Sequence, residues 1–393
     1  MFFDSAKKPL PAAYQNTVRS GELSFLMPGF PLPYARRCRK ANCSPPHLSN
    51  FYSKLKGVSV MQHLTQSIFV KNLELKNRLV MPPMASARSG QDGSVTSSLC
   101  SYYEERTHGG NIGLVITEHA FISPEGRASA GQLSVAEDSL LPGLARLAET
   151  LHRNHTPVFV QLNHAGSKAS KNDCPAVGPS AGAGPLEGAF ESEFQELSPD
   201  GIAGLADKFR KAALRAKQAG FDGVELHAAH GYLLNQFYSP LTNRRTDVYG
   251  GQTLDSRIRF LLETLKAVRG AVGEEYPIAV RLGGCDYKEG GSSIADSVSA
   301  CIALEKAGAD LLDISGGLFG YMVSDSREPG YFRDMTAQIK QAVQIPVLLT
   351  GGVTTPEQAE KLLAEKAADL IGVGRALLKD PSWADAAFSS PTI

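Results

Sequence analysis

The sequence lacks the features that mark several large classes of protein. Its 393 residues include 40 basic and 40 acidic side chains, so no excess of positive charge is available to neutralise nucleic-acid phosphates. No run approaches the ~18 uncharged apolar residues that a membrane-spanning helix needs. The six cysteines form no CxxC pair and no spacing typical of a zinc or iron–sulfur site. We therefore expect no nucleic-acid partner, no membrane partner, no metal and a reduced intracellular compartment.

The first 60 residues differ from the rest in charge and in periodicity. They carry nine Lys or Arg against two acidic residues, hold seven of the 23 prolines and show no sustained strand or helix period. We expect this basic, proline-containing leader to lie outside the fold. Three interpretations stay open: an organelle-targeting extension on an otherwise cytoplasmic protein, an unstructured leader, or an untranslated segment, since Met61 could serve as the start.

From Met61 onward, short apolar runs alternate with longer amphipathic stretches. Runs rich in Val, Ile and Leu are typical of strands that are buried on both faces. The eight expected strands are 78–83, 112–118, 157–163, 222–227, 277–282, 310–315, 345–350 and 369–373. The expected helices are 139–152, 199–219, 254–272, 293–307, 333–343, 356–364 and 375–386.

This alternation predicts an α/β fold, a (β/α)8 TIM barrel that forms one domain over residues 61–393. A doubly wound open sheet is the alternative, but no G-x-G-x-x-G fingerprint follows an early strand. Residues 68–76 alternate like a short β-hairpin before the first strand, and could close the floor of the barrel.

In such a barrel, polar residues at the carboxyl ends of the strands mark the active site. Gly351 and Gly352 follow the seventh strand, and Gly374 and Arg375 follow the eighth. Glycines let the backbone approach a phosphate closely, and a guanidinium adds charge and a fork of donors. We expect a phosphate site at these two loops; the alternative is that the glycines only form tight turns.

Two polar residues interrupt apolar strands. Arg281 lies within IAVRL, and a buried guanidinium needs an anionic partner. It either pairs with Glu225 or Asp313 on neighbouring strands or faces a ligand that gains negative charge. Gln161 can donate and accept at once, which suits the edge of a flat heterocycle, although a satisfied core amide is the ordinary alternative.

The densest polar cluster is His227-Ala-Ala-His230-Gly-Tyr232. Two imidazoles and a phenol at a strand end could be zinc ligands, but a third ligand and a Glu at metalloprotease spacing are missing. Donors aimed at a carbonyl oxygen, with Tyr232 as a proton donor, explain the cluster better.

These residues lie within longer motifs. The segments 227–251 (HAAHGYLLNQFYSPLTNRRTDVYGG), 77–84 (NRLVMPPM), 161–166 (QLNHAG) and 372–377 (GVGRAL) resemble the Old Yellow Enzyme family of FMN-dependent ene-reductases, and the match spans about residues 61–388. The resemblance implies a (β/α)8 barrel, bound FMN, NADH or NADPH as reductant, an enone or enoate-type substrate and a possible homo-oligomer.

The resemblance also implies a role for each site residue. Pro83, Met84 and Ala85 would run along the flavin, and Arg281 would face the N1/O2 end of reduced FMN. Hydride would go from flavin N5 to the substrate Cβ, and a proton from Tyr232 to Cα. The expected catalytic residues are Tyr232, His227 and His230, and the expected cofactor-binding residues are Pro83, Met84, Ala85, His119, Gln161, Arg281, Gly351, Gly352, Gly374 and Arg375.

One departure and two alternatives remain. Relatives often carry Cys or Thr where this sequence has Ala85, so a side-chain contact to the flavin is missing. The first alternative is a barrel lyase or isomerase that binds a phosphorylated substrate at the last two strand loops. Its aldolase-type members need a Schiff-base lysine, and no expected strand contains or ends with Lys. The second is a flavin carrier without catalytic activity.

Overall fold

The computed structural model describes residues 61–170, 175–181, 194–323, 326 and 328–389. The leader predicted for residues 1–60 lies outside the described residues. Eight parallel strands form a closed barrel in the order β10-β11-β12-β3-β4-β5-β8-β9, which confirms the predicted fold. The barrel strands are β3 (Leu79–Met81), β4 (Leu114–Phe121), β5 (Val158–Asn163), β8 (Gly223–Ala228), β9 (Ile278–Cys285), β10 (Leu311–Gly316), β11 (Val347–Thr350) and β12 (Leu370–Gly372).

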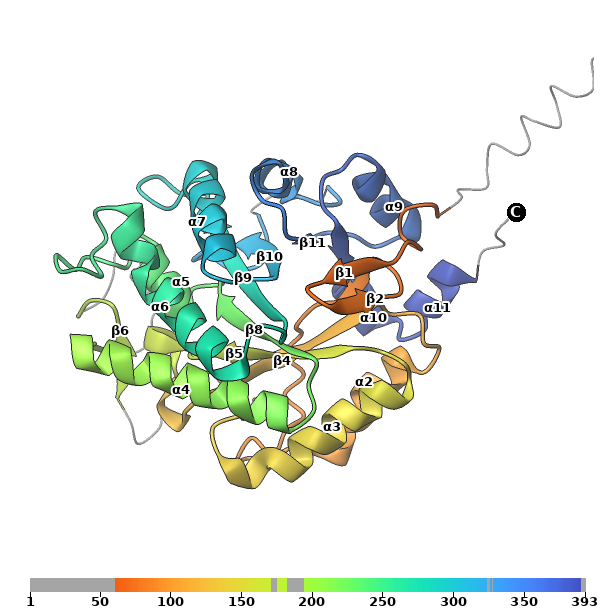
Figure 1. The fold of residues 1–393 in the computed structure, drawn as a ribbon, viewed down its shortest axis with the longest axis horizontal. Helices are drawn as coiled ribbons and strands as arrows, with labels where there is room; N and C mark the ends of the chain where they lie inside the picture. The colour runs from red at the N-terminus through yellow and green to blue at the C-terminus, as the bar shows by residue number, and fades with distance from the viewer. Residues whose placement is uncertain (1–60, 171–174, 182–193, 324–325, 327, 390–393) are drawn as a thin grey trace, which may run out of the picture. The chain divides into compact units, whose positions relative to one another are not determined.

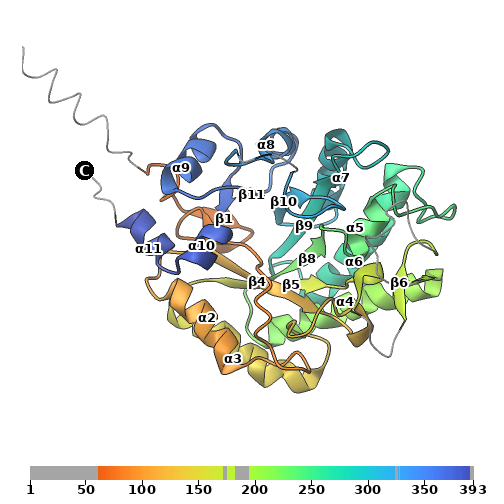
Figure 2. The ribbon, with the colours of Figure 1, turned by 180° about the vertical axis from the view of Figure 1, so that it is seen from behind.

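One helix follows each barrel strand, and the main helices surround the strands in both views (Figures 1 and 2). They are α2 (Ser97–Thr107), α3 (Leu141–Arg153), α4 (Pro199–Gln218), α6 (Leu254–Val272), α7 (Ile294–Lys306), α8 (Arg333–Ala342), α9 (Pro356–Ala364) and α10 (Arg375–Lys379). The structure also has two shorter helices, α5 (Leu233–Tyr238) and α11 (Trp383–Phe388), and a parallel strand pair, β6 (Ala176–Gly178) and β7 (Phe194–Glu196). No helix within the described ranges is long and apolar enough to cross a membrane.

The helices differ from the prediction in two places. Helix α2 was not expected, because its sequence SSLCSYYEERT is mostly polar and its buried face includes the polar residues Arg106 and Thr107. Thr96 caps it by accepting from the Leu99 N–H. The single helix expected at 375–386 is two helices, α10 and α11, separated around Pro381. Proline has no N–H for the helical ladder and its ring clashes with the preceding turn, which ends α10.

The barrel interior is built in layers, because alternate residues of each strand point inward. The lowest layer is apolar and includes Phe159, Leu311, Leu348 and Leu370, all fully buried. The antiparallel hairpin β1 (Ile68–Val70) and β2 (Leu73–Leu75) is labelled in Figure 1. Its buried side chains Val70 and Leu75 belong to the same apolar cluster. The hairpin therefore closes the floor of the barrel, as the alternation at 68–76 predicted.

A β-bulge changes which side chains β4 presents to the interior. Leu114 and Ile116 point inward in the apolar layer, so strict alternation would turn Glu118 inward next. The register against β5 shifts between Thr117 and His119, and His119 becomes the partner of Gln161. An extra residue in one strand reverses the alternation beyond it. His119 therefore faces the interior and Glu118 faces away from it.

Candidate active site

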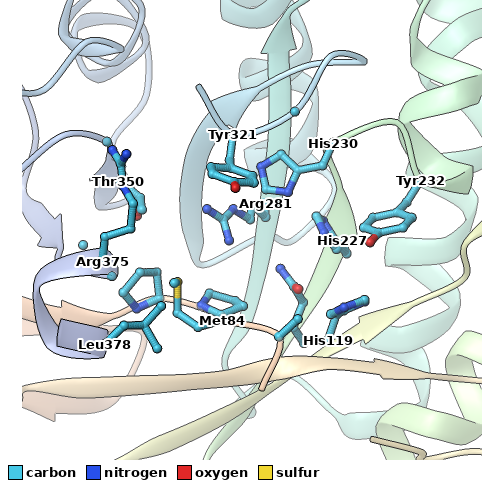
Figure 3. A pocket seen from close by; sticks show the side chains of 18 of the residues that line it. Met84, His119, His227, His230, Tyr232, Arg281, Tyr321, Thr350, Arg375 and Leu378 are labelled. Carbon is cyan, nitrogen blue, oxygen red and sulfur yellow. The ribbon is translucent and has the colours of Figure 1, made fainter. Parts of the chain in front are cut away.

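A cavity of about 570 Å³ opens at the carboxyl ends of the barrel strands, where this fold places active sites (Figure 3). Every residue predicted for the site lines it, from Pro83, Met84 and Ala85 after β3 to Arg375 at the start of α10. The structure thus brings the predicted residues together, while the role of each one remains a prediction.

A polar layer lies above the apolar floor. Gln161, Glu225, Arg281, Asp313 and Thr350 come from the neighbouring strands β5, β8, β9, β10 and β11. Gln161 donates through Nε2 to Glu225 Oε1 over 2.8 Å, and Thr350 Oγ1 donates to Asp313 Oδ1 over 3.3 Å. Gln161, Arg281 and Thr350 also line the cavity, so this layer is its polar base.

Arg281 pairs with Asp313, the first of the interpretations that its sequence position left open, and it also lines the cavity. Its Nε lies 3.1 Å from Asp313 Oδ2 in an ion pair without hydrogen-bond geometry. The positive charge of Arg281 thus stabilises the ionised form of two fully buried carboxyl groups, Glu225 and Asp313. Burial, and then the nearby charge of Asp313, raises the pKa of Glu225 well above its ordinary value, so we expect Glu225 to be neutral near pH 7.

Three rings gather at one end of the cavity. The His227 ring centroid lies 5.0 Å from that of His230 and 5.0 Å from that of Tyr232, in edge-to-face arrangements. The His119 ring stacks 5.3 Å from the Tyr232 ring. Figure 3 shows these side chains on the right of the cavity and Arg375 with Leu378 on the left, with Arg281 between them.

The imidazoles at this end are neutral near pH 7. Burial is the main cause that lowers the pKa of His227 and His230 well below the ordinary value, and the Arg281 charge adds to it. Burial also lowers the pKa of His119 to about 4. Gln132 Nε2 and Asn163 Nδ2 lie 3.0 and 3.2 Å from His119 Nδ1. Because amide N–H groups need an acceptor, Nδ1 of His119 is unprotonated and Nε2 carries the hydrogen.

At the opposite end of the cavity, glycines allow a ligand to approach the backbone closely. A Cβ at Gly374 would lie 2.8 Å from Met84 Sδ, and a Cβ at Gly351 would lie 2.7 Å from the Tyr331 ring. Gly352 has φ of +71°, which L side chains rarely adopt. Arg375 is exposed, and the only partner that the described residues give its Nη1 is Met322 Sδ at 3.5 Å. This end therefore fits a phosphate, and the whole cavity fits FMN laid between the glycines and the imidazoles.

The cavity lining is positively charged. Lys168, Arg281 and Arg375 line it, and none of the lining residues that the structure describes is Asp or Glu. Such a lining favours a ligand with phosphate or other anionic groups. Within the described part of the chain, no group of three or more His, Cys, Asp or Glu could hold a metal ion.

Two residues near the strand ends do not join the site. His164 is buried against Gly126, and its Nδ1 accepts from the Gly166 N–H. Glu118 faces away from the cavity and accepts a hydrogen bond from Ser86 Oγ. Sequence reasoning also missed several cavity residues in loops, among them Lys168, Tyr321 and Tyr331. For Lys168 a signal existed, since it follows the QLNHAG motif by two residues.

Comparison with known proteins identifies the relatives of this chain. Residues 63–389 match the family described as NADH:flavin oxidoreductase / NADH oxidase. An NADH oxidase of Thermoanaerobacter brockii is 40% identical over 320 residues, which cover 80% of this chain and 49% of the relative, so the chain spans about half the length of that protein. An NADPH dehydrogenase of Halalkalibacterium halodurans is 37% identical over 325 residues, 82% of this chain and 93% of the relative.

A solved structure agrees with these matches. An old yellow enzyme homologue from Zymomonas mobilis superposes with a TM-score of 0.72 at 28% identity, and the likeness covers 84% of this chain and 93% of that one. The fold similarity therefore extends over the whole barrel rather than over a shared half.

Proposed function

We propose that this chain, which belongs to the NADH:flavin oxidoreductase / NADH oxidase family, is an FMN-dependent oxidoreductase that uses NADH or NADPH and reduces the C=C bond of α,β-unsaturated carbonyl compounds. Bound FMN would supply the redox chemistry, taking a hydride from the nicotinamide and giving it to the substrate Cβ. The observation that carries the proposal is the grouping of two neutral imidazoles and a protonated phenol at one end of the cavity.

His227 and His230 would bind the carbonyl oxygen. Each is neutral and has one N–H to donate, and both line the cavity. Negative charge develops on that oxygen as hydride reaches Cβ, so two fixed donors stabilise the transition state more than the ground state. Ser315 Oγ lies 2.8 Å from His230 Nε2 and helps to fix the orientation of that ring.

Tyr232 would supply the proton for Cα. Burial raises the pKa of its phenol, so the group stays protonated over the physiological range. The hydride at Cβ and the proton at Cα together complete the reduction of the double bond. Arg281, held at the polar base by Asp313, would face the end of the cofactor that gains negative charge on reduction.

The lyase or isomerase alternative has one new point in its favour and a larger one against it. Lys168 lines the cavity from a loop and not from a strand end, so the cavity does contain a lysine. Family membership, however, indicates flavin redox chemistry and not a Schiff base. We therefore retain the oxidoreductase proposal alone.

A two-step spectroscopic experiment tests this function. The purified protein should show an oxidised flavin spectrum that NADH or NADPH bleaches without oxygen, and that cyclohexenone then restores with formation of cyclohexanone. A saturated ketone is the control and should restore nothing. Bleaching that cyclohexenone cannot reverse would show a flavin reductase with another acceptor, and our proposal would be wrong.

A further inference from the structure

Lys168 is the one basic residue of the cavity lining to which neither the flavin nor the phosphate gives a role. It ends the short 3-10 turn Gly166–Lys168 after β5. No ion pair joins it to any acidic residue of the described chain, in contrast to Arg281 with Asp313. Among the described residues, the ammonium has one hydrogen-bond partner: Nζ donates to the backbone carbonyl oxygen of His230 over 2.9 Å. An ammonium has three donors, so the described residues leave two for a ligand.

The chain makes room for this ammonium beside the imidazoles. Gly231 has φ of +72°, and a Cβ at that position would lie 2.5 Å from Lys168 Nζ and 2.7 Å from the Leu318 carbonyl oxygen. Any side chain at residue 231 would therefore displace the ammonium. The glycine after His230 is required by the backbone conformation and by the presence of the lysine together.

A buried amide holds the two segments together. Gln236 on α5 is fully buried; its Oε1 accepts from the Ser167 N–H over 3.1 Å. Its Nε2 donates to the carbonyl oxygens of Ala165 over 3.1 Å and Gly231 over 2.7 Å. The same side chain thus fixes the turn that carries Lys168 and the loop that carries His230. The two backbone segments that carry Lys168 and His230 are therefore tied to each other, which keeps the ammonium within reach of the imidazoles.

The charge of Lys168 reaches the site where the carbonyl oxygen would bind. Burial is the largest cause of the lowered pKa of His230, and the positive charges of Arg281 and then Lys168 add to it. Lys168 also contributes to the lowered pKa of His227. Burial lowers the pKa of Lys168 itself, and no carboxylate within the described ranges offsets that effect. Partial desolvation of an unpaired cation costs free energy that an anionic ligand recovers.

We propose that Lys168 forms an anion subsite of the substrate pocket, which makes unsaturated carbonyl compounds with an additional carboxylate the preferred substrates. The proposal rests on the proposed function. His227 and His230 hold the carbonyl oxygen, and the two free N–H donors of Lys168 hold the carboxylate at the same end of the cavity. Figure 3 shows that end, with Tyr321 beside His230.

Paired probes separate the carboxylate from the rest of the substrate. The unsaturated pair is acetylacrylate and its methyl ester, and the saturated pair is levulinate and its methyl ester. Reduction of the first pair is followed with the reduced holoenzyme, and binding of the second pair is followed through the spectrum of the oxidised holoenzyme, which needs no turnover. The ratio of acid to ester is compared between variants, because intrinsic reactivity cancels from that comparison.

In Lys168→Met, the acid-to-ester ratio of kcat/KM and the acid-to-ester ratio of binding constants should each fall about 10- to 100-fold, as expected for loss of a charged hydrogen bond. Lys168→Arg keeps the charge and should restore part of the ratio. The matched control is Lys266→Met, which removes a positive charge from an exposed position on α6 and should leave both ratios unchanged. Lys168→Gln makes the same comparison if Lys168→Met does not fold.

The outcomes separate the two proposals. Equal losses for acid and ester would mean that Lys168 only supports the His230 loop, and the anion subsite would be refuted. A loss confined to flavin reduction by NADPH would assign the ammonium to a dinucleotide phosphate and would refute it as well. If wild type reduces neither probe but binds levulinate more tightly than its ester through Lys168, the subsite stands and the proposed function fails.

Discussion

At the scale of single residues, the site depends on which groups carry protons. Tyr232 is a phenol whose already high pKa is raised further by burial, so it keeps its proton, and burial lowers the pKa of His227, which keeps that imidazole neutral. The two residues would act in different parts of the same half-reaction. Substitutions that change one property at a time therefore separate their roles.

Tyr232→Phe keeps the ring and removes the proton donor. Flavin reduction by NADH or NADPH requires no proton at the substrate Cα, so its rate should stay close to wild type. Reoxidation by an enone should slow about 10²-fold, the lower end of the range for loss of a general acid, because water can replace the phenol in part. Stopped-flow absorbance of each half-reaction measures both rates.

His227→Ala is the comparison for that variant. It removes a donor to the carbonyl oxygen, so both substrate binding and the hydride step should weaken. If Tyr232→Phe instead slowed flavin reduction and spared the enone, the role assigned to Tyr232 would be incorrect.

Glu225 gives a second prediction at this scale. A neutral Glu225 is matched closely by Gln, so Glu225→Gln should change the free energy of unfolding little. Glu225→Leu leaves the buried Gln161 N–H without an acceptor and should cost about 1–3 kcal/mol. Urea denaturation at pH 7 compares the two. Equal losses in both variants would indicate that Glu225 is ionised in the folded protein.

At the scale of elements, β4 connects the site to the loop after β3. The bulge between Thr117 and His119 sends Glu118 out of the barrel, where Ser86 donates to its carboxyl group through Oγ and through the backbone N–H. Ser86 directly follows Ala85, which lines the cavity. A change in the charge of Glu118 therefore acts on the anchor of a cavity loop.

The stability of this connection should depend on pH. Burial raises the pKa of Glu118 from its ordinary 4.5 to about 7, although hydrogen bonds from Ser86 oppose the shift. Between these values the folded protein keeps a proton that the unfolded chain has lost, so the free energy of unfolding falls as pH rises, by up to ~1.4 kcal/mol per pH unit. Urea denaturation from pH 5 to pH 8 should show this slope in wild type relative to Glu118→Gln. Parallel curves for the two proteins would contradict the raised pKa.

The loops after β11 and β12 carry a prediction about the cofactor. Arg375→Ala removes the guanidinium beside Gly374 and should weaken FMN binding about 10- to 100-fold through loss of a charged hydrogen bond. Fluorescence titration of the apoprotein with FMN measures the dissociation constant. The exposed Lys379 lies on the same short helix, so Lys379→Ala is the control and should bind FMN normally. Unchanged affinity in Arg375→Ala would place the phosphate elsewhere.

At the scale of the whole molecule, the sequence predicted the barrel because its strands are continuous apolar runs, and the site because polar side chains interrupt those runs or follow them. Arg281 and His227 were visible for that reason. Lys168 and Tyr321 were not, since they lie on loops whose path depends on tertiary contacts such as those of Gln236. The inward turn of His119 rests on a bulge that alternation alone does not specify.

The closed floor has a kinetic consequence. Because Val70 and Leu75 fill the amino-terminal end of the barrel, the cavity can exchange reactants only through its mouth at the carboxyl ends. The nicotinamide and the carbonyl compound would then occupy one place in turn, and the oxidised nicotinamide must leave before the second reactant enters. We expect ping-pong kinetics: initial rates measured against NADPH at several fixed enone concentrations should give parallel double-reciprocal lines, and high enone concentrations should inhibit competitively with NADPH. Intersecting lines would require both reactants to be bound at once, and would contradict a single position that they occupy in turn.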